Sequence, residues 1–173
     1  MKHFLVLNGP NINMTGLREK NVYGTNTYED LVSMIQAHAQ ALGCEVTCRQ
    51  SNSEGQLIDF IQQAYFDHLD GIVFNPGGYT HTSVALHDAV ASVPIPTIEV
   101  HMSNIHRRES FRHVSMTASA CEGQIVGLGF QGYLLALTAL MSTTQSTKEE
   151  GHSVPHAWIH ISSFSAIRNS RSS

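Results

Sequence analysis

The sequence predicts an α/β protein with a doubly wound, mostly parallel sheet in a single domain. Short apolar runs, such as residues 4–7 and 71–74, alternate along the chain with segments whose apolar residues recur at helical spacing. Parallel strands need crossover helices, and these helices pack on the two faces of the sheet. A length of 173 residues allows one full hydrophobic core and is short for two.

The first strand and the first helix have clear ends. Residues 4–7 form a continuous apolar run, typical of a strand buried on both faces, and the run stops at an Asn-Gly-Pro-Asn loop. The helix is expected to begin after Thr27, which has the spacing of a capping pair with Asp30. Gly43 is suited to end the helix, because glycine readily adopts the left-handed conformation there.

Further strands and helices follow in the same alternation. Ser53 and Gln56 have the spacing of a capping box at the start of the second helix, and later helices are expected over residues 80–90 and 133–141. The remaining strands are expected at residues 46–50, 71–74, 97–100 and 124–128. Because the chain offers five strands, a flavodoxin-like strand order is favoured over a longer Rossmann sheet.

Residues 142–173 differ in composition from the rest of the chain. Twelve of these 32 residues are Ser or Thr, and no helical stripe of apolar residues runs through them. We therefore expect a domain over residues 1–141, followed by a flexible tail. The alternative is that residues 156–161, which include the single Trp158, pair as an extra strand or dock on another subunit.

Charge and cysteine content exclude several classes of protein. Ten basic and fourteen acidic residues give a net charge of −4, which argues against a nucleic-acid binder, because binding a phosphate backbone needs a basic excess. Charged residues make up 14% of the chain, against about a quarter in typical soluble domains, and this indicates surface buried between subunits. The three cysteines lack zinc or redox spacing and are expected to be free thiols.

The sequence predicts no signal peptide and no membrane partner. No long apolar segment with a cleavage site follows Met1, so we expect a cytoplasmic protein. Residues 123–147 hold no charged residue, but glycines and glutamines interrupt them. A buried strand followed by a buried helix explains this stretch better than a transmembrane span does.

Polar side chains are concentrated after the first, third and fourth strands, where ligands of a doubly wound sheet bind. Four of the five arginines before residue 142 follow the first or the fourth strand, which indicates an anionic ligand such as a carboxylate or phosphate. A single asparagine in such a loop is often explained by turn formation alone. The polar residues concerned are Asn8, Asn11, Asn13, Arg18, Tyr23, Asn75, His81, His101, Ser103, His106, Arg107, Arg108 and Arg112.

Two pairs of residues are candidates for proton transfer. Glu99 and His101 are two apart in a strand and therefore on the same side, where a carboxylate can hold an imidazole charged as a general acid. A purely structural histidine is the alternative. Arg18 and Tyr23 share one loop, in which the arginine would favour the phenolate and so make the tyrosine a base near neutral pH.

Nucleotide and metal motifs do not account for this sequence. Residues 127–132 match G-x-G-x-x-G, but the match lies in the last strand–helix unit, and glycines that allow close packing of helix and sheet explain it better. The chain has no P-loop, no H-E-x-x-H and no nucleophile-elbow serine. We therefore expect no cofactor and no metal.

Several segments, in unbroken order from about residue 2 to residue 141, closely resemble type II 3-dehydroquinase. The resemblance implies a flavodoxin-like fold and the dehydration of 3-dehydroquinate to 3-dehydroshikimate, an anti elimination through an enolate that needs no cofactor or metal. Two alternatives with the same fold are a flavin-binding electron carrier, which should have a Ser/Thr/Gly-rich first loop, and a catalytically silent regulatory or scaffolding domain. The segments that carry the resemblance are residues 7–13, 16–19, 22–24, 74–83, 98–112 and 127–133.

The resemblance also implies catalytic roles for particular residues. Tyr23 matches the base that removes the C2 proton, and Arg18 matches the residue that favours its phenolate. Asn11 matches the residue that holds a water against the enolate oxygen. His101 matches the acid that protonates the departing C1 hydroxyl, and Glu99 matches its orienting partner.

Substrate binding and assembly are implied in the same way. The backbone amides of Met102 and Ser103 would bind the substrate carboxylate, and the substrate's ring hydroxyls would be held by Asn75, His81 and Arg112. Asp88, expected on the same helix as His81, would reach the site of a neighbouring subunit. Members of the family form trimers that group into a dodecamer. Lys20 departs from the family, which often has proline there.

Overall fold

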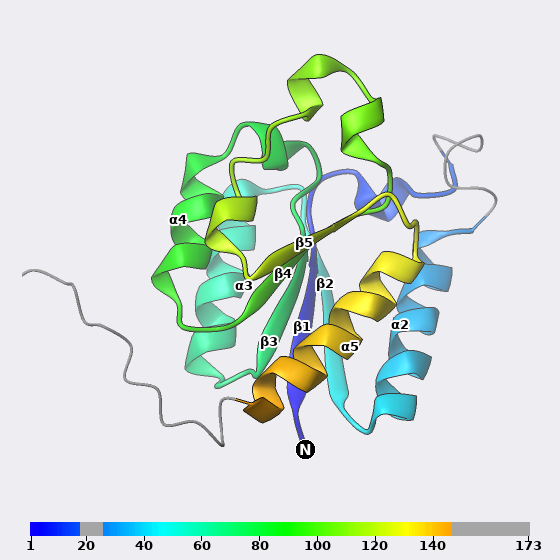
Figure 1. Cartoon of the computed structure of the whole chain (residues 1–173), viewed down its shortest axis with the longest axis vertical. Helices are drawn as coiled ribbons and strands as arrows, with labels where there is room; N and C mark the ends of the chain where they lie inside the picture. Colours follow the sequence, from blue (N-terminus) through cyan, green and yellow to red (C-terminus); the bar gives the residue numbers. More distant parts are fainter. Residues whose placement is uncertain (18–25, 147–173) are drawn as a thin grey trace, which may run out of the picture.

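A five-stranded parallel sheet forms the centre of the protein (Figure 1). The structure is a computed structural model and describes residues 1–17 and 26–146. The strand order is β2-β1-β3-β4-β5, which is the flavodoxin-like order that the sequence predicts. The strands are β1 (His3–Asn8), β2 (Glu45–Gln50), β3 (Gly71–Asn75), β4 (Thr97–His101) and β5 (Gly123–Val126), and the helices are α2 (Tyr28–Leu42), α3 (Glu54–Phe66), α4 (Val84–Ser92) and α5 (Gln131–Ser146).

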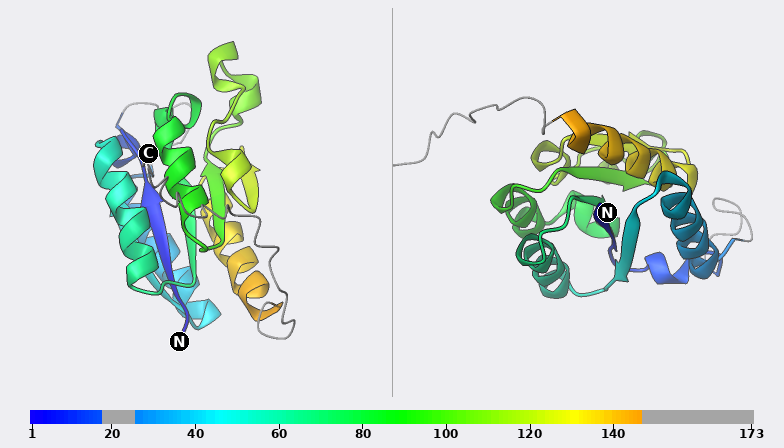
Figure 2. Two further views of the ribbon diagram at one scale, coloured as in Figure 1. Left: turned by 90° about the vertical axis from the view of Figure 1, so that its left-hand side faces the viewer. Right: turned by 90° about the horizontal axis from the view of Figure 1, so that it is seen from below.

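The helices cover both faces of the sheet, as Figure 2 shows. Along β1, Phe4 and Val6 point to the cluster that packs on α2 and α5, whereas Leu5 and Leu7 point to the cluster that packs on α3 and α4. These four side chains are at most 3% exposed. A strand buried on both faces reads as an unbroken apolar run, which is why residues 4–7 show no polar alternation.

Parallel pairing brings the carboxyl ends of the central strands to one edge of the sheet. Asn8, the last residue of β1, is in register with Asn75, the last residue of β3. Beyond that edge, short 3-10 helices carry the chain around the strand ends: η1 (Ile12–Met14), η2 (Gly77–His81), η3 (Ile105–Arg107) and η4 (Ser110–Arg112). Two of these helices protrude from the sheet (Figure 1). Another 3-10 helix, η5 (Ala118–Ala120), precedes β5 and packs beside α4.

The first two predicted helix starts are present in the structure. Thr27 and Asp30 form a reciprocal capping box, and Gly43 ends α2 with φ of 73°. The Ser53 side chain accepts a hydrogen bond from the Gln56 backbone N–H, but the capping box is not reciprocal. The Gln56 side chain instead accepts from Ser51 Oγ at 2.6 Å, since that hydroxyl is also near the helix start.

The helix expected over residues 80–90 begins later than the sequence indicates. Thr80 and His81 belong to η2, and α4 begins at Val84 because the Ser83 side chain caps it by accepting from the Leu86 backbone N–H at 2.9 Å. The expectation that His81 and Asp88 share one helix is therefore wrong. At the other end of the chain, the sequence predicts a flexible tail over residues 142–173, but α5 continues past residue 141 to Ser146, so residues 142–146 are helical. Residues 147–173 lie outside the described residues.

The glycines of residues 127–132 serve the packing of α5 and its preceding loop. Gly127 and Gly129, both with positive φ, donate backbone hydrogen bonds to His101 O and Met102 O. A Cβ on Gly132 would meet Val100 Cγ1 at 3.3 Å. These contacts favour the packing explanation of the G-x-G-x-x-G match.

Gly9 is required where the loops after β1 and β3 touch, because a Cβ there would lie 2.3 Å from Pro76 O. We predict that Gly9→Ala lowers the free energy of unfolding by about 1–3 kcal/mol through overpacking. Gly78→Ala is the matched control, since no atom lies within 4 Å of its added Cβ. Urea unfolding of both variants is the measurement, and equal losses would contradict the steric explanation.

Candidate active site

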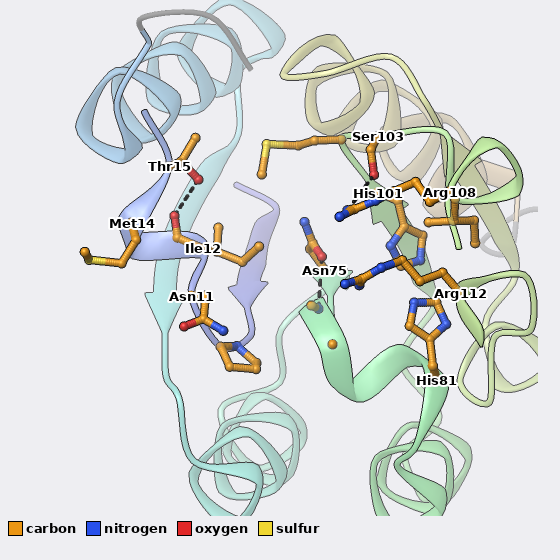
Figure 3. Close-up of a pocket in the computed structure, with 15 residues that line it drawn as sticks. Asn11, Ile12, Met14, Thr15, Asn75, His81, His101, Ser103, Arg108 and Arg112 are labelled. Atoms are coloured by element: carbon orange, nitrogen blue, oxygen red, sulfur yellow. Dashed lines mark hydrogen bonds between the residues drawn. The ribbon is translucent and has the colours of Figure 1, made fainter. Parts of the chain in front are cut away.

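A pocket opens where the loops after β1, β3 and β4 meet (Figure 3). Its volume of about 310 Å³ is at the small end of the range for small-molecule sites. One wall is mainly apolar and comes from the β1 loop and η1, whereas the opposite wall carries the basic side chains. The lining residues are Pro10, Asn11, Ile12, Met14, Thr15, Asn75, Gly77, Gly78, His81, His101, Met102, Ser103, Ile105, Arg108 and Arg112.

Most of the site residues predicted from the sequence meet in this pocket. Glu99 lies behind its wall, bonded to His101. Asp88 does not line the pocket: its carboxylate is on α4, 73% exposed, and contacts His87. Arg18 and Tyr23 lie outside the described residues. The predicted residues that line the pocket are Asn11, Asn75, His81, His101, Met102, Ser103 and Arg112.

Glu99 and His101 form a buried pair at the end of β4. The distance from His101 Nε2 to Glu99 Oε1 is 2.6 Å, and the side chains are 6% and 0% exposed. Residues two apart in a strand point to the same side, so the strand itself sets this contact. An ionised carboxylate only accepts hydrogen bonds, so Nε2 carries a proton and Nδ1 is the nitrogen left for proton transfer in the pocket.

The Glu99 carboxyl is ionised despite its complete burial. Burial raises its pKa, but hydrogen bonds from His101 and Thr117, the charge of His101 and a hydrogen bond from Gln124 together lower the pKa below its ordinary value of 4.5. The charge-stabilising contacts outweigh desolvation. A negative charge therefore lies directly against the imidazole, where it stabilises the protonated form that a general acid needs.

Asn75 is held in one orientation by a buried chain of hydrogen bonds. Its Oδ1 accepts from the Gly77 backbone N–H at 3.1 Å, which fixes which end of the amide is oxygen. Its Nδ2 therefore donates a hydrogen bond to Tyr133 Oη at 2.8 Å, and the Tyr133 hydroxyl in turn donates a hydrogen bond to Asn8 Oδ1 at 2.7 Å. Asn75 thus presents its second N–H as a donor at the pocket.

Asn8 supports this chain from beneath the pocket. Its Nδ2 is buried and has no hydrogen-bond partner among the described residues. The same side chain lies near the Tyr28 hydroxyl, whose pKa is raised by burial and lowered in part by Asn8. Because Asn8 Oδ1 accepts from Tyr133, Asn8 ends the chain of hydrogen bonds that begins at the Gly77 backbone N–H.

His81 and Arg112 approach the pocket from the β3 and β4 loops. His81 Nδ1 lies 2.8 Å from Val114 O, and a carbonyl only accepts, so Nδ1 carries the proton and Nε2 remains for the pocket. Arg112 Nε donates to Glu109 Oε2 at 2.9 Å, and its guanidinium carbon lies 5.0 Å from the centre of the Phe111 ring. These contacts orient both side chains toward one volume, as Figure 3 shows.

Asn11, Met102 and Ser103 complete the predicted set. Asn11 has φ of 68°, a left-handed conformation that asparagine tolerates, so turn formation accounts for its presence as well as a role in the site does. Met102 is buried, and Ser103 Oγ accepts from Arg108 at 3.4 Å. Arg108 is thereby drawn into the same pocket wall.

Several residues of the site have no clear signal in the sequence. Arg108 is only one of the arginines after the fourth strand, and nothing in the spacing separates it from Arg107. Tyr133 and Asn8 meet although they are 125 residues apart. Thr117 and Gln124 reach Glu99 from segments that carry no motif. Such contacts depend on tertiary packing, which spacing along the chain does not report.

The arrangement defines a class of protein: an α/β protein with a small pocket lined by basic side chains and a buried Glu–His pair in its wall. In the part of the chain that the structure describes, no three potential metal ligands cluster together. Among the same residues, no helix is long and apolar enough to cross a membrane.

The comparisons with known proteins place the chain in one family. The family Dehydroquinase class II matches residues 2–141, so the chain belongs to the class II dehydroquinase family. It is 58% identical over 138 residues to the 3-dehydroquinate dehydratase of Lachnoclostridium phytofermentans, and the match covers 80% of this chain and 95% of that protein. It is 59% identical over 138 residues to the enzyme of that name from Lachnospira eligens, with 79% of this chain and 94% of that protein covered.

Solved structures give the same result. The type II dehydroquinase of Butyrivibrio crossotus superposes with a TM-score of 0.79 at 55% identity, covering 80% of this chain and 97% of that one. A 3-dehydroquinate dehydratase-like protein from Bifidobacterium longum matches with a TM-score of 0.63 at 30% identity, and the match covers 84% of this chain and 99% of that one. The resemblance seen in the sequence motifs is confirmed.

The buried Glu99 charge predicts how stability depends on pH. Its folded-state pKa is lowered, so its contribution to stability is present above the ordinary value of 4.5 and is lost as pH falls through the folded value. We predict that Glu99→Gln has a smaller loss of unfolding free energy between pH 6 and pH 3 than the parent protein. Denaturant unfolding at a series of pH values measures this, and identical slopes for the two proteins would contradict it.

Proposed function

We propose that this chain dehydrates 3-dehydroquinate to 3-dehydroshikimate. The observation that carries the proposal is the Glu99–His101 pair, an acid with its own buried counter-charge, in the wall of a small pocket with two arginines. The pocket volume suits a single-ring substrate, and the positive charge of the arginines suits an anionic one. The names of the relatives point to the same reaction.

The elimination needs one base and one acid on opposite sides of the substrate ring. Tyr23 as phenolate removes the C2 proton, and the electron pair of that C–H bond enters the enolate, with charge on the C3 oxygen. Arg18 favours the phenolate, and a water held by Asn11 stabilises the enolate oxygen. When the enolate collapses, the C1–O bond breaks, and His101 protonates the departing hydroxyl to give water.

Substrate binding is shared among the three loops. The backbone amides of Met102 and Ser103, with the Ser103 hydroxyl, bind the carboxylate in this scheme. Asn75, oriented through Tyr133, donates to a ring hydroxyl. His81 and Arg112 hold the remaining hydroxyls from the wall opposite η1. The net reaction removes a proton and a hydroxyl group from the substrate as one water molecule, and no step changes an oxidation state that would need a cofactor.

The direct test is the ultraviolet absorbance of the purified protein mixed with 3-dehydroquinate. The conjugated enone of the product absorbs, whereas the substrate hardly does, so absorbance should rise with time. A flat trace over a wide range of enzyme concentration and pH would exclude the proposed reaction.

Removal of the acid or the base should affect the chemical step. We predict that His101→Ala and Tyr23→Phe each lower kcat by at least about a hundredfold, because a positioned proton-transfer group contributes roughly 10² to 10⁴. Steady-state absorbance assays measure kcat, and circular dichroism checks the fold. Near-normal kcat in Tyr23→Phe would mean that another residue is the base.

Two arginines of one loop distinguish a specific substrate contact from the general effect of positive charge on the surface. Arg112 lines the pocket, whereas Arg107 is exposed outside it. We predict that Arg112→Ala raises KM by roughly ten- to a hundredfold, because the loss of a charge-assisted hydrogen bond costs about 1.5–3 kcal/mol. Arg107→Ala is the matched control and should change KM by less than about twofold. Equal effects would indicate a diffuse basic surface in place of a specific contact.

We further propose that the chain assembles into trimers, grouped into a dodecamer, in which Asp88 completes the site of a neighbouring subunit. Two observations support this: the low charge content of the sequence and the position of Asp88, exposed on α4 outside the pocket of its own subunit.

Complementation between inactive subunits tests the shared site. We predict that Asp88→Asn and His101→Ala are each poorly active alone. Equal amounts unfolded and refolded together should recover about a quarter of the parent activity, since random pairing places an intact His101 beside an intact Asp88 at that frequency. A mixture of His101→Ala with Arg112→Ala is the control and should show no more activity than the two variants have separately, because both residues line one subunit's pocket. No recovery with Asp88→Asn would contradict the shared site.

A further inference from the structure

The segment that returns from η4 toward the sheet contacts the site at every residue from 114 to 117. Val114 O pairs with His81 Nδ1 at 2.8 Å, and the Met116 backbone N–H donates to Thr80 O at 2.7 Å. These two residues therefore contact η2. The side chains of Ser115 and Thr117, which alternate with them, contact Glu99 instead.

The alternate residues of this segment contact the buried carboxylate. Ser115 Oγ donates to Glu99 Oε1 at 2.8 Å, and Thr117 Oγ1 donates to Glu99 Oε2. From β5, Gln124 Nε2 donates to Oε1 at 2.8 Å. Glu99 and Thr117 are both completely buried. Beside His101, Glu99 thus has three neutral donors, and both of its oxygens are engaged.

We propose that Thr117, Ser115 and Gln124 are positioning residues for the catalytic acid, which they control through Glu99. They hold the carboxylate ionised and in one orientation, so that the proton resides on His101 and not on Glu99, and His101 can deliver it to the departing substrate hydroxyl. The inference rests on the proposed function, because it assigns these residues to the same reaction. None of the three lines the pocket, and no motif of the sequence includes Ser115, Thr117 or Gln124.

The charge balance around Glu99 supports this role. The other titratable group close to it is Cys121, whose pKa is raised to about 12, by burial first and then by the charges of Glu99 and Glu122. The thiol therefore stays protonated and neutral, and it adds no charge beside Glu99. Apart from His101, neutral donors alone support the carboxylate within the described residues. The titratable side chains that share the pocket with His101 are His81, Arg108 and Arg112.

The test compares two substitutions of one buried residue. Thr117→Val keeps the shape and removes the donor, whereas Thr117→Ser keeps the donor and removes a methyl group. We expect Thr117→Val to lower kcat about tenfold or more, with KM changed by less than about twofold, because the acid and not the binding contacts is affected. We expect Thr117→Ser to retain at least about half of the parent kcat.

The pH profile of kcat gives a second readout that a purely structural role would not move. With one donor fewer, the Glu99 carboxylate is a stronger base and binds the proton that it shares with His101 more tightly, so the basic limb of the profile should move to higher pH. Gln124→Met, on the exposed edge strand, should shift the same limb in the same direction. This variant keeps the test decisive if Thr117→Val does not fold.

Thr97→Val is the matched control, because Thr97 is a buried threonine of β4 whose hydroxyl donates to Ile95 O and not to Glu99. It is expected to leave the pH profile unchanged. The proposal is overturned if Thr117→Val and Gln124→Met keep the parental profile, if Thr117→Ser is as impaired as Thr117→Val, or if Thr97→Val causes the same shift.

A readout without substrate separates this inference from the proposed reaction. In ¹H–¹⁵N spectra of histidine-labelled protein, the ring signals lost in His101→Gln identify His101. Those signals should titrate at higher pH in Gln124→Met than in the parent, whatever the reaction is. An inactive parent protein would overturn the proposed function, whereas unchanged His101 signals in an active enzyme would overturn only the positioning role.

Discussion

The arrangement of the site depends on one buried negative charge, the carboxylate of Glu99. An isolated carboxylate in the interior would take up a proton, because desolvation favours the neutral form. Here the charge is retained because four side chains donate to its two oxygens. Three of those donors come from segments other than β4, so the charge is stable only when β5 and the return segment are in place.

The fold supplies those segments at the correct edge of the sheet. In a parallel sheet, every strand ends at the same edge, so β1, β3 and β4 deliver Asn8, Asn75 and His101 side by side. The doubly wound connections bury both faces of the central strands and leave the carboxyl edge for loops. Backbone contacts between those loops, such as Gly9 N–H to Asn75 O at 2.7 Å, hold the pocket walls together.

The two sides of the pocket are held in different ways. On the acid side, an ionised group organises neutral donors around His101. On the other side, the chain from Gly77 through Asn75 and Tyr133 to Asn8 contains only neutral groups, and its direction is set by one backbone N–H. Both arrangements restrict side-chain rotation before a substrate arrives, which lowers the entropy lost on binding.

The sequence by itself determined the alternation of strands and helices, the strand order, the capping of α2 and the family. These features depend on residues close together in the chain, such as the apolar run of β1, and the Glu99–His101 pair is of the same kind because a strand places residues two apart on one side. Only the tertiary structure decided that α4 begins at Val84 and that Thr117 and Tyr133 support the site. Those outcomes depend on which hydrogen-bond donors and acceptors lie close to one another in the folded chain. Packing between elements that are far apart in the sequence sets those distances.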